Sequence, residues 1–454
     1  MSKRQLFGTD GIRGKANIYP MNPEVATALG RAVTSYFQKL NPEQVPTVVV
    51  GKDTRLSCYM LEQAFGAGVC SQGGRVIFTG PLPTPGVAFV TKSMRAQIGV
   101  MISASHNNYA DNGLKIFDNN GYKLPDEVEL ELENLILNPQ SLEQKLDDKI
   151  GRAKRLEGVE GRYIVHVKDA IDEQYDLAGM RIVVDCANGA AYKVAPLVFS
   201  ELGAEVFSLG VSPNGMNINL NCGSLHPEMA QEEVKRLRAD IGFCLDGDAD
   251  RLQVIDKEGE IIDGDVLIGI FAKLLLSKGK LKKGDTVVGT VMSNLGLEVF
   301  IKSLGLNFHR TKVGDRYIME YMKKNNAMLG GEPSGHIIFS DEATTGDGTL
   351  ASLKTIEALK HFNLTLEELS NEVPLYPQVL KNVKVKEKPE FDKISKLSSL
   401  VDSINKDLGE KGRIIIRYSG TEPLARVMIE GENFEVIDKY CDQLIDILQS
   451  EIGL

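Results

Sequence analysis

The feature that most constrains this chain is a strand–helix–strand pattern that recurs three times along its 454 residues. Each repeat opens on a β-branched run that breaks into a turn of small or polar residues, and these runs are Thr47–Gly51, Arg181–Asp185 and Thr286–Met292. A helical stretch and a second strand that begins at a glycine follow each run, at Gly74–Gly80, Gly203–Gly210 and Gly305–Thr311. Units of this kind build mostly parallel sheets. The pattern therefore predicts three related α/β domains with mixed, mostly parallel sheets.

A third apolar strand in each repeat runs directly into a polar loop. The three loops are Ser103–Asn107, Asp246–Arg251 and Glu332–His336. Ligands of open α/β sheets bind beyond the carboxyl ends of the strands. We therefore expect the three domains to present three chemically different loops from equivalent positions.

The pattern changes near residue 370. Prolines and a Lys/Glu-rich stretch indicate a linker and a first strand up to about Pro389, and a helical stretch follows at Phe391–Leu408. Two strands, Arg413–Arg417 and Ala425–Glu430, then precede an amphipathic helix that runs to Leu454. We predict a smaller α+β fourth domain, and we place the four domains at residues 1–155, 156–254, 255–370 and 371–454.

The charge balance argues against some classes of binding partner. The chain has 52 basic and 62 acidic side chains, a formal net charge of −10 and no long Lys/Arg run, which argues against a nucleic-acid or anionic-membrane binder. No apolar run approaches the ~20 residues that span a bilayer. Scattered cysteines without a C-x-x-C pair fit reduced thiols in a cytosolic protein. We expect a cytoplasmic protein that acts on a small molecule, without nucleic-acid or membrane partners.

Asp246, Asp248 and Asp250 alternate along the second polar loop. Alternate residues of an extended backbone project to the same side, so the three carboxylates can converge on one hard cation. An EF-hand is excluded, because its loop would require glycine where Arg251 stands and glutamate where Lys257 stands. Three carboxylates without a further obvious ligand suit Mg²⁺, which completes its shell with water or phosphate oxygens. A solvated acidic turn is the alternative.

Ser105 lies in the first polar loop, directly after the apolar run Ile98–Ile102. The G-x-S-x-G motif of a hydrolase nucleophile is absent around it. Neighbouring side chains on a strand point apart, so Ser105 and His106 are not expected to form part of a triad. A serine that carries a phosphoryl group and faces the acidic loop fits better, since a metal would neutralise the charge during transfer. A plain Ser/Asn-rich turn is the alternative.

The fourth domain contains a candidate phosphate cradle. Its guanidinium groups, hydroxyls and glycine amide together suit phosphate, and they come from Arg417, Ser419, Gly420, Thr421 and Arg426. A plain hairpin turn is the alternative. The phosphate-loop and dinucleotide-binding signatures are absent from the sequence, which disfavours a nucleotide as phosphoryl donor.

Two further loops offer groups for a sugar phosphate. Glu332, Ser334 and His336 combine a carboxylate, a hydroxyl and an imidazole, which suit sugar hydroxyls, and His336 can serve in proton transfer. A purely structural histidine is the alternative. Near the start of the chain, glycines flank Arg13, which can bind phosphate or form a salt bridge.

These loops together resemble the α-D-phosphohexomutase superfamily, nearly end to end. The resemblance rests on Phe7–Gly14, Ile102–Asn107, Asp246–Arg251, Gly331–His336 and Arg417–Pro423. It implies four domains around a central cleft, with the fourth domain mobile. It also implies that Ser105 is a phosphoserine whose phosphate joins Asp246, Asp248 and Asp250 around one Mg²⁺ per subunit.

The resemblance assigns roles to the remaining candidates. Lys115 matches a position near the reacting phosphate, and the expected catalytic set is Ser105, His106, Lys115, His336 and Arg13. The expected substrate-binding residues are Arg251, Glu332, Ser334, Arg417, Ser419, Gly420, Thr421 and Arg426.

Three segments resemble the amino-sugar branch of this superfamily, namely Phe7–Gly14, Pro213–Asn219 and Lys312–Tyr317. That branch interconverts glucosamine 6-phosphate and glucosamine 1-phosphate through a 1,6-bisphosphate of glucosamine or glucose, and so supplies UDP-N-acetylglucosamine and cell-wall precursors. A homodimer is compatible with the resemblance. The alternatives are a phosphoglucomutase or phosphomannomutase, and a non-catalytic phosphosugar-binding protein. Three positions depart from the family pattern: Asn108 replaces a usual Pro, Pro333 a Gln common in the amino-sugar branch, and Asn214 a usual Asp.

Overall fold

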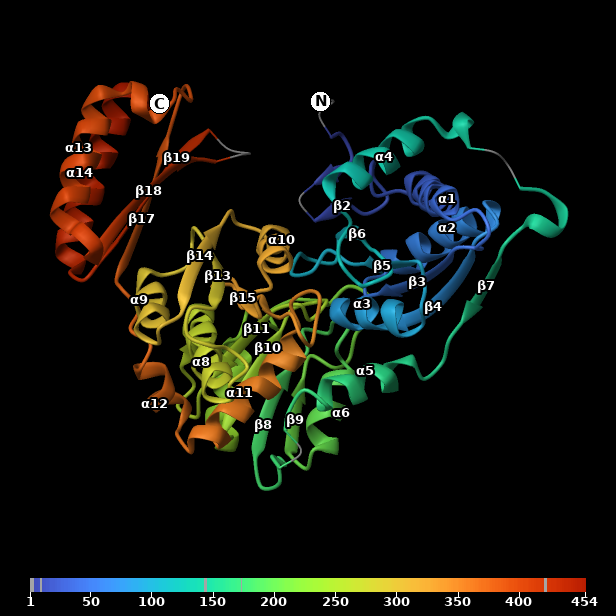
Figure 1. Ribbon diagram of the computed structural model, residues 1–454, viewed down its shortest axis with the longest axis horizontal. Coiled ribbons are helices and arrows are strands. Elements are labelled where there is room, and N and C mark those ends of the chain that lie inside the picture. The colour runs from blue at the N-terminus through green and yellow to red at the C-terminus, as the bar shows by residue number, and fades with distance from the viewer. Residues whose placement is uncertain (1–3, 9, 143–144, 173, 420–422) are drawn as a thin grey trace. The chain divides into compact units, whose positions relative to one another are not determined.

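The structure is a computed structural model that describes residues 4–8, 10–142, 145–172, 174–419 and 423–454. The chain divides into two compact units (Figure 1). The first spans Met1–Met292 and Leu306–Ser370, and the second spans Ser293–Gly305 and Asn371–Leu454. Among the described residues, no helix is long and apolar enough to cross a membrane.

The first unit contains three sheets, and the N-terminal repeat forms the first of them. Its strand order is β1-β2-β6-β5-β3-β4-β7. The strands are β1 Phe7–Gly8, β2 Gly11–Lys15, β3 Thr47–Lys52, β4 Arg75–Pro81, β5 Ile98–Ile102, β6 Asp111–Phe117 and β7 Arg152–Arg155. β3 pairs in parallel with β4 and β5, whereas β6 pairs antiparallel with β5 and β2.

The second and third repeats each build a sheet of their own. The second sheet has the order β12-β11-β10-β8-β9, and the third has the order β14-β13-β15-β16. Their strands are β8 Arg181–Asp185, β9 Glu205–Leu209, β10 Ile241–Leu245, β11 Leu252–Ile255, β12 Ile261–Ile262, β13 Thr286–Thr290, β14 Asn307–Thr311, β15 Leu329–Gly331 and β16 Ile337–Phe339.

All three sheets share one four-stranded plan, which confirms the predicted repeat. The first strand of each repeat (β3, β8 or β13) lies between the second (β4, β9 or β14) and the third (β5, β10 or β15), and all three run parallel. A fourth strand (β6, β11 or β16) pairs antiparallel with the third. The sequence did not reveal these fourth strands, because the polar loops before them are longer than a two-residue hairpin turn.

Helices cover both faces of the first sheet. Val48 and Val50 of β3 belong to the same core as α1 and α2, whereas Gly51 faces Val87 of α3, so α1 and α2 lie on one face and α3 on the other (Figure 1). The helices of the first unit are α1 Pro23–Leu40, α2 Ser57–Ser71, α3 Thr84–Ser93, α4 Asp126–Leu137, α5 Val159–Lys168, α6 Val194–Glu201, α7 Glu228–Leu237, α8 Gly264–Ser277, α10 Asp315–Asn325, α11 Gly348–Phe362 and α12 Leu366–Asn371, whose last residue begins the second unit.

The contact between α1 and α2 depends on two glycines. A Cβ at Gly30 of α1 would lie 2.3 Å from the carbonyl oxygen of Phe65. A Cβ at Gly68 of α2 would lie 2.1 Å from the carbonyl oxygen of Thr27. The two helices approach this closely only because both positions lack a side chain.

The second unit has the predicted α+β composition. Its three strands are antiparallel, in the order β17-β19-β18, and Cys441 and Leu444 of the last helix share a core with Ile429 of β19. Helix α9 belongs to this unit, where Asn294 Oδ1 accepts a hydrogen bond from the amide of Tyr376 at 2.9 Å. The elements of this unit are α9 Leu295–Ser303, β17 Gln378–Lys384, α13 Ser395–Leu408, β18 Gly412–Tyr418, β19 Leu424–Gly431 and α14 Phe434–Ile452.

Gly68→Ala tests the contact between α1 and α2. The added Cβ would meet a backbone oxygen, so we expect the free energy of unfolding to fall by about 1–3 kcal/mol, as measured by urea-induced unfolding. Gly161→Ala is the control, because Gly161 is an exposed residue of α5 with no other part of the described chain within 4 Å of its Cβ position. Alanine there should stabilise the protein by about 0.5–1 kcal/mol. Equal stability of the two variants would contradict this account of the packing.

Candidate active site

Three polar loops, one from each repeat, supply the residues of the candidate site. They follow β5, β10 and β15. Ser105 Oγ in the first loop donates a hydrogen bond to Asp246 Oδ2 in the second at 2.6 Å. Asp250 Oδ1 in the second loop faces His336 Nδ1 in the third at 3.8 Å. The three loops therefore meet at one place in the first unit.

The second loop gathers the three predicted metal ligands. One carboxylate oxygen from each of Asp246, Asp248 and Asp250 lies within 4.8 Å of the others, and all three side chains are buried. The loop turns sharply at Ala249, whose φ is +58°. Asp248 Oδ1 is buried and accepts no hydrogen bond from the described residues. A buried carboxylate oxygen left unsatisfied beside two other carboxylates fits a hard cation such as Mg²⁺.

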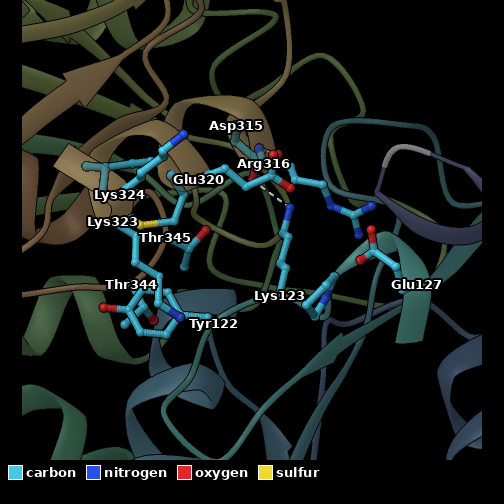
Figure 2. A pocket seen from close by; sticks show the side chains of 13 residues that line it. Tyr122, Lys123, Glu127, Asp315, Arg316, Glu320, Lys323, Lys324, Thr344 and Thr345 are labelled. Carbon is cyan, nitrogen blue, oxygen red and sulfur yellow. Dashed lines mark hydrogen bonds and ion pairs between the residues drawn. The ribbon is translucent and has the colours of Figure 1, made fainter. Parts of the chain in front are cut away.

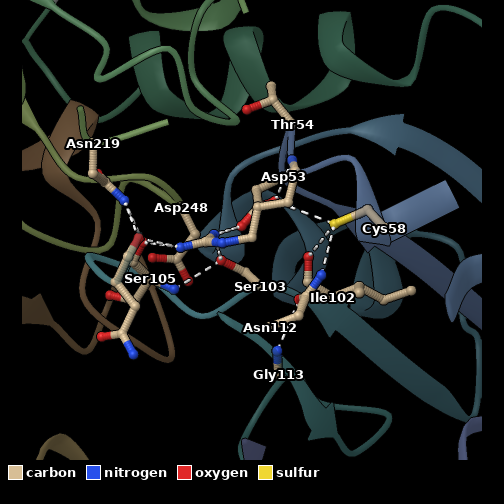
Figure 3. Close-up of polar contacts among 12 residues, drawn as sticks. Asp53, Thr54, Cys58, Ile102, Ser103, Ser105, Asn112, Gly113, Asn219 and Asp248 are labelled. Atoms are coloured by element: carbon tan, nitrogen blue, oxygen red, sulfur yellow. Dashed lines mark hydrogen bonds and ion pairs between the residues drawn. The ribbon is translucent and has the colours of Figure 1, made fainter. Parts of the chain in front are cut away.

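Ser105 adopts an unusual backbone conformation. Its φ is +53°, and its amide donates to Ser103 Oγ at 2.9 Å (Figure 3). Its hydroxyl lies 3.3 Å from His106 Nδ1, although the sequence argument expected the two side chains to point apart. Neighbouring side chains point apart only on an extended strand, and the left-handed turn at Ser105 interrupts that geometry. The serine and the histidine are therefore in contact.

His106 is the neutral histidine of the site. Burial, followed by the charges of Arg251 and Arg13, lowers the pKa of His106 to about 4. The imidazole is therefore uncharged at pH 7 and can accept a proton.

The carboxylates of the metal loop do not ionise alike. Burial, followed by the charges of Asp250 and Asp248, raises the pKa of Asp246 well above its usual range. Burial acts in the same direction on Asp250, but the charges of Lys115 and His336 outweigh it and hold the pKa of Asp250 well below its usual range. Without a cation, Asp246 therefore retains a proton more readily than Asp250.

Lys115, on β6, supplies a buried positive charge. Its ammonium group donates to Asp248 Oδ2 at 2.7 Å and to Asp250 Oδ2 at 3.2 Å, and it lies 3.4 Å from Asp10 Oδ2. Burial opposes protonation, but the charges of these three carboxylates outweigh it and raise the pKa of Lys115 well above its usual value. Lys115 therefore remains an ammonium ion, suited to neutralising phosphate rather than to accepting a proton. Thr84 Oγ1 also donates to Asp248 Oδ2, at 2.5 Å.

A chain of ion pairs that sequence reasoning missed continues from Lys115. Asp10 pairs with Lys115, Arg13 and Lys123, and Lys123 Nζ lies 2.5 Å from Asp315 Oδ2. Lys123 and Asp315 also line a pocket of about 550 Å³, in which Figure 2 shows Lys123 extending toward Asp315. Asp10 could have been found beside Arg13 in its glycine-flanked loop. Lys123 and Asp315 could not, because no motif joins residues 192 positions apart.

The third loop lines a cavity of about 380 Å³. Glu332 and His336 of this loop line it together with Arg251, Arg13 and Asp250. Burial opposes protonation of His336, but Asp250 and two further carboxylates outweigh it and raise the pKa of His336 above its usual value. A concave site with cations, a carboxylate and an imidazole suits a phosphorylated sugar.

The remaining predicted residues that the structure describes do not line this cavity. Ser334 is half-buried in the third loop. Arg417 and Arg426 are directly opposite each other on β18 and β19 of the second unit, and Ser419 follows β18. Gly420 and Thr421 lie outside the described residues.

Two of the three departures from the family pattern have a structural explanation. Asn108 Oδ1 accepts a hydrogen bond from the amide of Ala110 at 2.9 Å, so its side chain closes the turn that a proline would stiffen. Asn214 Oδ1 accepts one from the amide of Met216 at 2.9 Å, a contact that an aspartate can also make. Nothing in the structure explains Pro333.

Four family models match successive parts of the chain. They describe the alpha/beta/alpha domains I, II and III and the C-terminal domain of phosphoglucomutase/phosphomannomutase, and they match residues 4–143, 161–259, 263–376 and 380–447. Among curated relatives, a phosphoglucosamine mutase of Desulfotalea psychrophila is 50% identical over 98% of this chain and 99% of its own length. A phosphoglucosamine mutase of Pelobacter propionicus is also 50% identical, over 99% of both chains.

Solved structures share the fold. A phosphoglucomutase/phosphomannomutase family protein from Burkholderia thailandensis matches with a TM-score of 0.80 at 24% identity, over 98% of this chain and 99% of its own. The N-acetylphosphoglucosamine mutase of Aspergillus fumigatus, solved with GlcNAc-6P and magnesium, matches with a TM-score of 0.65 at 19% identity, over 99% and 96%. Matches to all four domain models, and relatives at half identity over the full length, show that this chain belongs to the phosphoglucomutase/phosphomannomutase family of phosphosugar mutases.

Proposed function

We propose that this phosphosugar mutase interconverts glucosamine 6-phosphate and glucosamine 1-phosphate through a 1,6-bisphosphate intermediate. The relatives at about 50% identity, which carry the name phosphoglucosamine mutase, support this choice of sugar. On this proposal the enzyme acts in the cytoplasm and supplies UDP-N-acetylglucosamine and cell-wall precursors. A homodimer stays a prediction.

One observation supports Ser105 as the residue that carries the phosphoryl group. Ser105 Oγ lies 2.6 Å from Asp246 Oδ2, within a group of carboxylates whose oxygens lie within 4.8 Å of one another. A nucleophile that attacks carbon gains nothing from so much negative charge. A phosphoserine beside a metal site does, because a bound cation would neutralise the charge of the phosphate and of the carboxylates together.

We assign the cation to Mg²⁺, held by Asp246, Asp248, Asp250 and an oxygen of the phosphate on Ser105. All of these donors are oxygens, and Asp248 Oδ1 lacks a hydrogen bond from the described residues, which suits a hard cation. When bound, Mg²⁺ would withdraw negative charge from the phosphoryl group during transfer. Lys115 neutralises the same region as a permanent ammonium ion.

In the proposed reaction, the free hydroxyl of the sugar monophosphate attacks the phosphorus on Ser105. A new P–O bond to the sugar forms while the bond to Ser105 Oγ breaks, and the product is the bisphosphate. After the bisphosphate turns around, Ser105 Oγ attacks its other phosphoryl group, which regenerates phosphoserine and releases the isomeric monophosphate.

Two histidines with opposite pKa shifts are suited to the protons of this reaction. His106, with its pKa lowered to about 4, is neutral and lies 3.3 Å from Ser105 Oγ, so it can accept the proton of an attacking hydroxyl. His336, whose pKa is raised, holds a proton that it can donate to a departing oxygen. A pair of titratable groups whose pKa values are pushed apart is typical of acid and base partners.

Residues of the first unit supply the proposed contacts to the sugar and to one phosphate. Glu332, Arg251 and Arg13 line the cavity beside Asp250 and would bind the sugar hydroxyls and a phosphate. Arg417 and Ser419 of the second unit stay predictions for the second phosphate.

A coupled assay with glucosamine, glucose and mannose 6-phosphates tests the choice of substrate. We expect turnover that requires Mg²⁺, with the highest kcat/KM for glucosamine 6-phosphate. A higher value for glucose or mannose 6-phosphate would instead assign a phosphoglucomutase or phosphomannomutase. No turnover of any of the three would favour the non-catalytic phosphosugar-binding protein.

Ser105→Ala tests the phosphoserine. We expect phosphate on Ser105 of the purified enzyme by peptide mass spectrometry, and a loss of kcat of at least about 1,000-fold in the variant, because the phosphoryl carrier is gone. Ser200→Ala is the control, because Ser200 is exposed at the end of α6. An active Ser105→Ala enzyme, or phosphate found on another residue alone, would contradict the assignment.

Calorimetric titration with Mg²⁺ tests the metal site. Because the pKa of Asp246 is raised, a proton competes with the cation, so the apparent affinity should fall as pH falls, beginning above the range where an ordinary aspartate titrates. Asp248→Asn should weaken binding by at least about tenfold. Asp240→Asn is the control, since it removes one exposed negative charge from the same repeat. Equal Mg²⁺ affinity of the two variants would refute the site.

A further inference from the structure

The loop that carries Ser105 is held from outside by two side chains. The carbonyl oxygens of Ser105 and Asn107 each accept hydrogen bonds from both of them. With a φ of +53°, Ser105 lies in the left-handed region, which residues other than glycine keep only where their surroundings impose it. The two side chains that donate to these carbonyls are therefore the most direct candidates for imposing this backbone conformation.

One of the two side chains is Arg55, which follows β3 in the first repeat. Its Nη2 donates to the carbonyl oxygen of Asn107 at 2.6 Å and to that of Ser105 at 3.1 Å, and its Nε donates to that of Asn108 at 3.4 Å. The side chain of Arg55 is fully buried. A guanidinium group offers five N–H donors in a rigid plane, so one arginine can hold several carbonyls at once.

Asp53 holds this guanidinium group in place. Its carboxylate pairs with Arg55 Nη1 and accepts a hydrogen bond from the Arg55 amide at 2.9 Å. Cys58 Sγ donates to Asp53 Oδ1 at 3.2 Å and accepts from Asn112 Nδ2 at 3.3 Å (Figure 3). A buried arginine is costly unless its charge is paired and its donors are used. Here the pairing leaves the remaining donors of Arg55 directed at the backbone of the Ser105 loop.

The other side chain is Asn219, which comes from the second repeat. Its Nδ2 donates to the carbonyl oxygens of Ser105 and Asn107 at 2.9 Å each, and Figure 3 shows the amide directed at Ser105. The backbone amide of Asn219 donates to the carbonyl oxygen of Ala187 at 2.9 Å, which anchors it within its own repeat. Asn219 is the last residue of Pro213–Asn219, a segment that resembles the amino-sugar branch. That resemblance does not assign a role to the segment.

We infer that Arg55 and Asn219 are positioning residues for phosphoryl transfer, which fix the Ser105 loop so that Ser105 Oγ faces the three carboxylates. The inference rests on the proposed function of Ser105. Asn219 and the metal loop belong to the same repeat. The contact between Asn219 and the Ser105 loop therefore fixes the position of Ser105 relative to the metal loop as well as to the sheet of the first repeat. Gly247 of the metal loop lies so close that a Cβ there would come within 2.6 Å of the Ser105 carbonyl oxygen.

Loss of either side chain would remove half of the hydrogen bonds that these two carbonyls receive from Arg55 and Asn219. Ser105 could then relax toward an ordinary φ, which would move Oγ away from the carboxylates. A displacement of about 1 Å in reacting geometry can cost about 100-fold in rate. A purely structural role predicts a different result, namely a lower unfolding temperature with an unchanged rate for each folded, phosphorylated molecule.

Asn219→Ala tests the inference, with Asn217→Ala as matched control. Asn217 lies in the same segment, but its side chain bonds to Ser212 and Asn214. Normalised to phosphorylated enzyme, we expect kcat of Asn219→Ala to fall by about 10- to 100-fold, with KM for glucosamine 6-phosphate changed by less than about threefold. Asn217→Ala should keep the kcat of the parent enzyme.

Arg55→Lys is the second variant, because it retains the charge beside Asp53 but cannot hold the same set of carbonyls. Single-turnover transfer from the phosphorylated enzyme to glucosamine 6-phosphate should slow by about the same factor as in Asn219→Ala. If the parent enzyme is phosphorylated on Ser105 and both variants transfer at its rate, the positioning role is wrong while the proposed function stands. A parent enzyme without phosphate on Ser105 would overturn both.

Discussion

The repulsion among three buried carboxylates is the constraint on which the candidate site depends. Two unit charges 4 Å apart interact by about 4 kcal/mol at the effective dielectric typical of proteins. Asp246, Asp248 and Asp250 place three such groups within 4.8 Å of one another. The loop cannot hold three ionised carboxylates without positive charge nearby, and Lys115 supplies part of it. The pKa of Asp246 is raised and the pKa of Asp250 is lowered, so the nearby positive charge does not stabilise the two carboxylates equally.

The need for positive charge also explains why ion pairs extend well beyond the metal loop. Lys115 lies between the metal loop and Asp10, and Asp10 pairs in turn with Lys123, which pairs with Asp315. Each charge is neutralised by the next, so their burial is tolerated. The chain of pairs runs from the second repeat through the first to the third. It therefore connects the three repeats at the site.

Repetition of one sheet plan makes a site of this kind available. Each repeat ends its third strand in a loop at the same topological position, the carboxyl edge where ligands bind in open α/β sheets. The loops differ in chemistry: the first offers the hydroxyl of Ser105, the second three carboxylates, and the third Glu332 and His336. The site combines groups from all three loops, because Ser105, the three aspartates and His336 come from different repeats. Hydrogen bonds such as that from Thr84 to Asp248 hold the loops of different repeats in register.

By itself, the sequence determined the three parallel strands of each repeat and the chemistry of each polar loop. β-Branched runs such as Arg181–Asp185 became strands, and the alternating aspartates of Asp246–Asp250 became a compact carboxylate group. Both outcomes depend on residues that are close neighbours along the chain, so a local pattern predicts them. Even so, the left-handed turn at Ser105 was not predictable, because serine alone does not favour it.

Only the tertiary structure decided which loops meet and which polar side chains are buried in pairs. Ser105 and Asp246 lie 141 positions apart, and Asn219 reaches Ser105 across 114 positions. Arginine, lysine and asparagine are mostly exposed in proteins. The residue type therefore does not indicate that Arg55, Lys123 and Asn219 are buried or partly buried here. Their roles follow from packing, because a buried polar group must find a partner and only the folded chain brings that partner within hydrogen-bond distance.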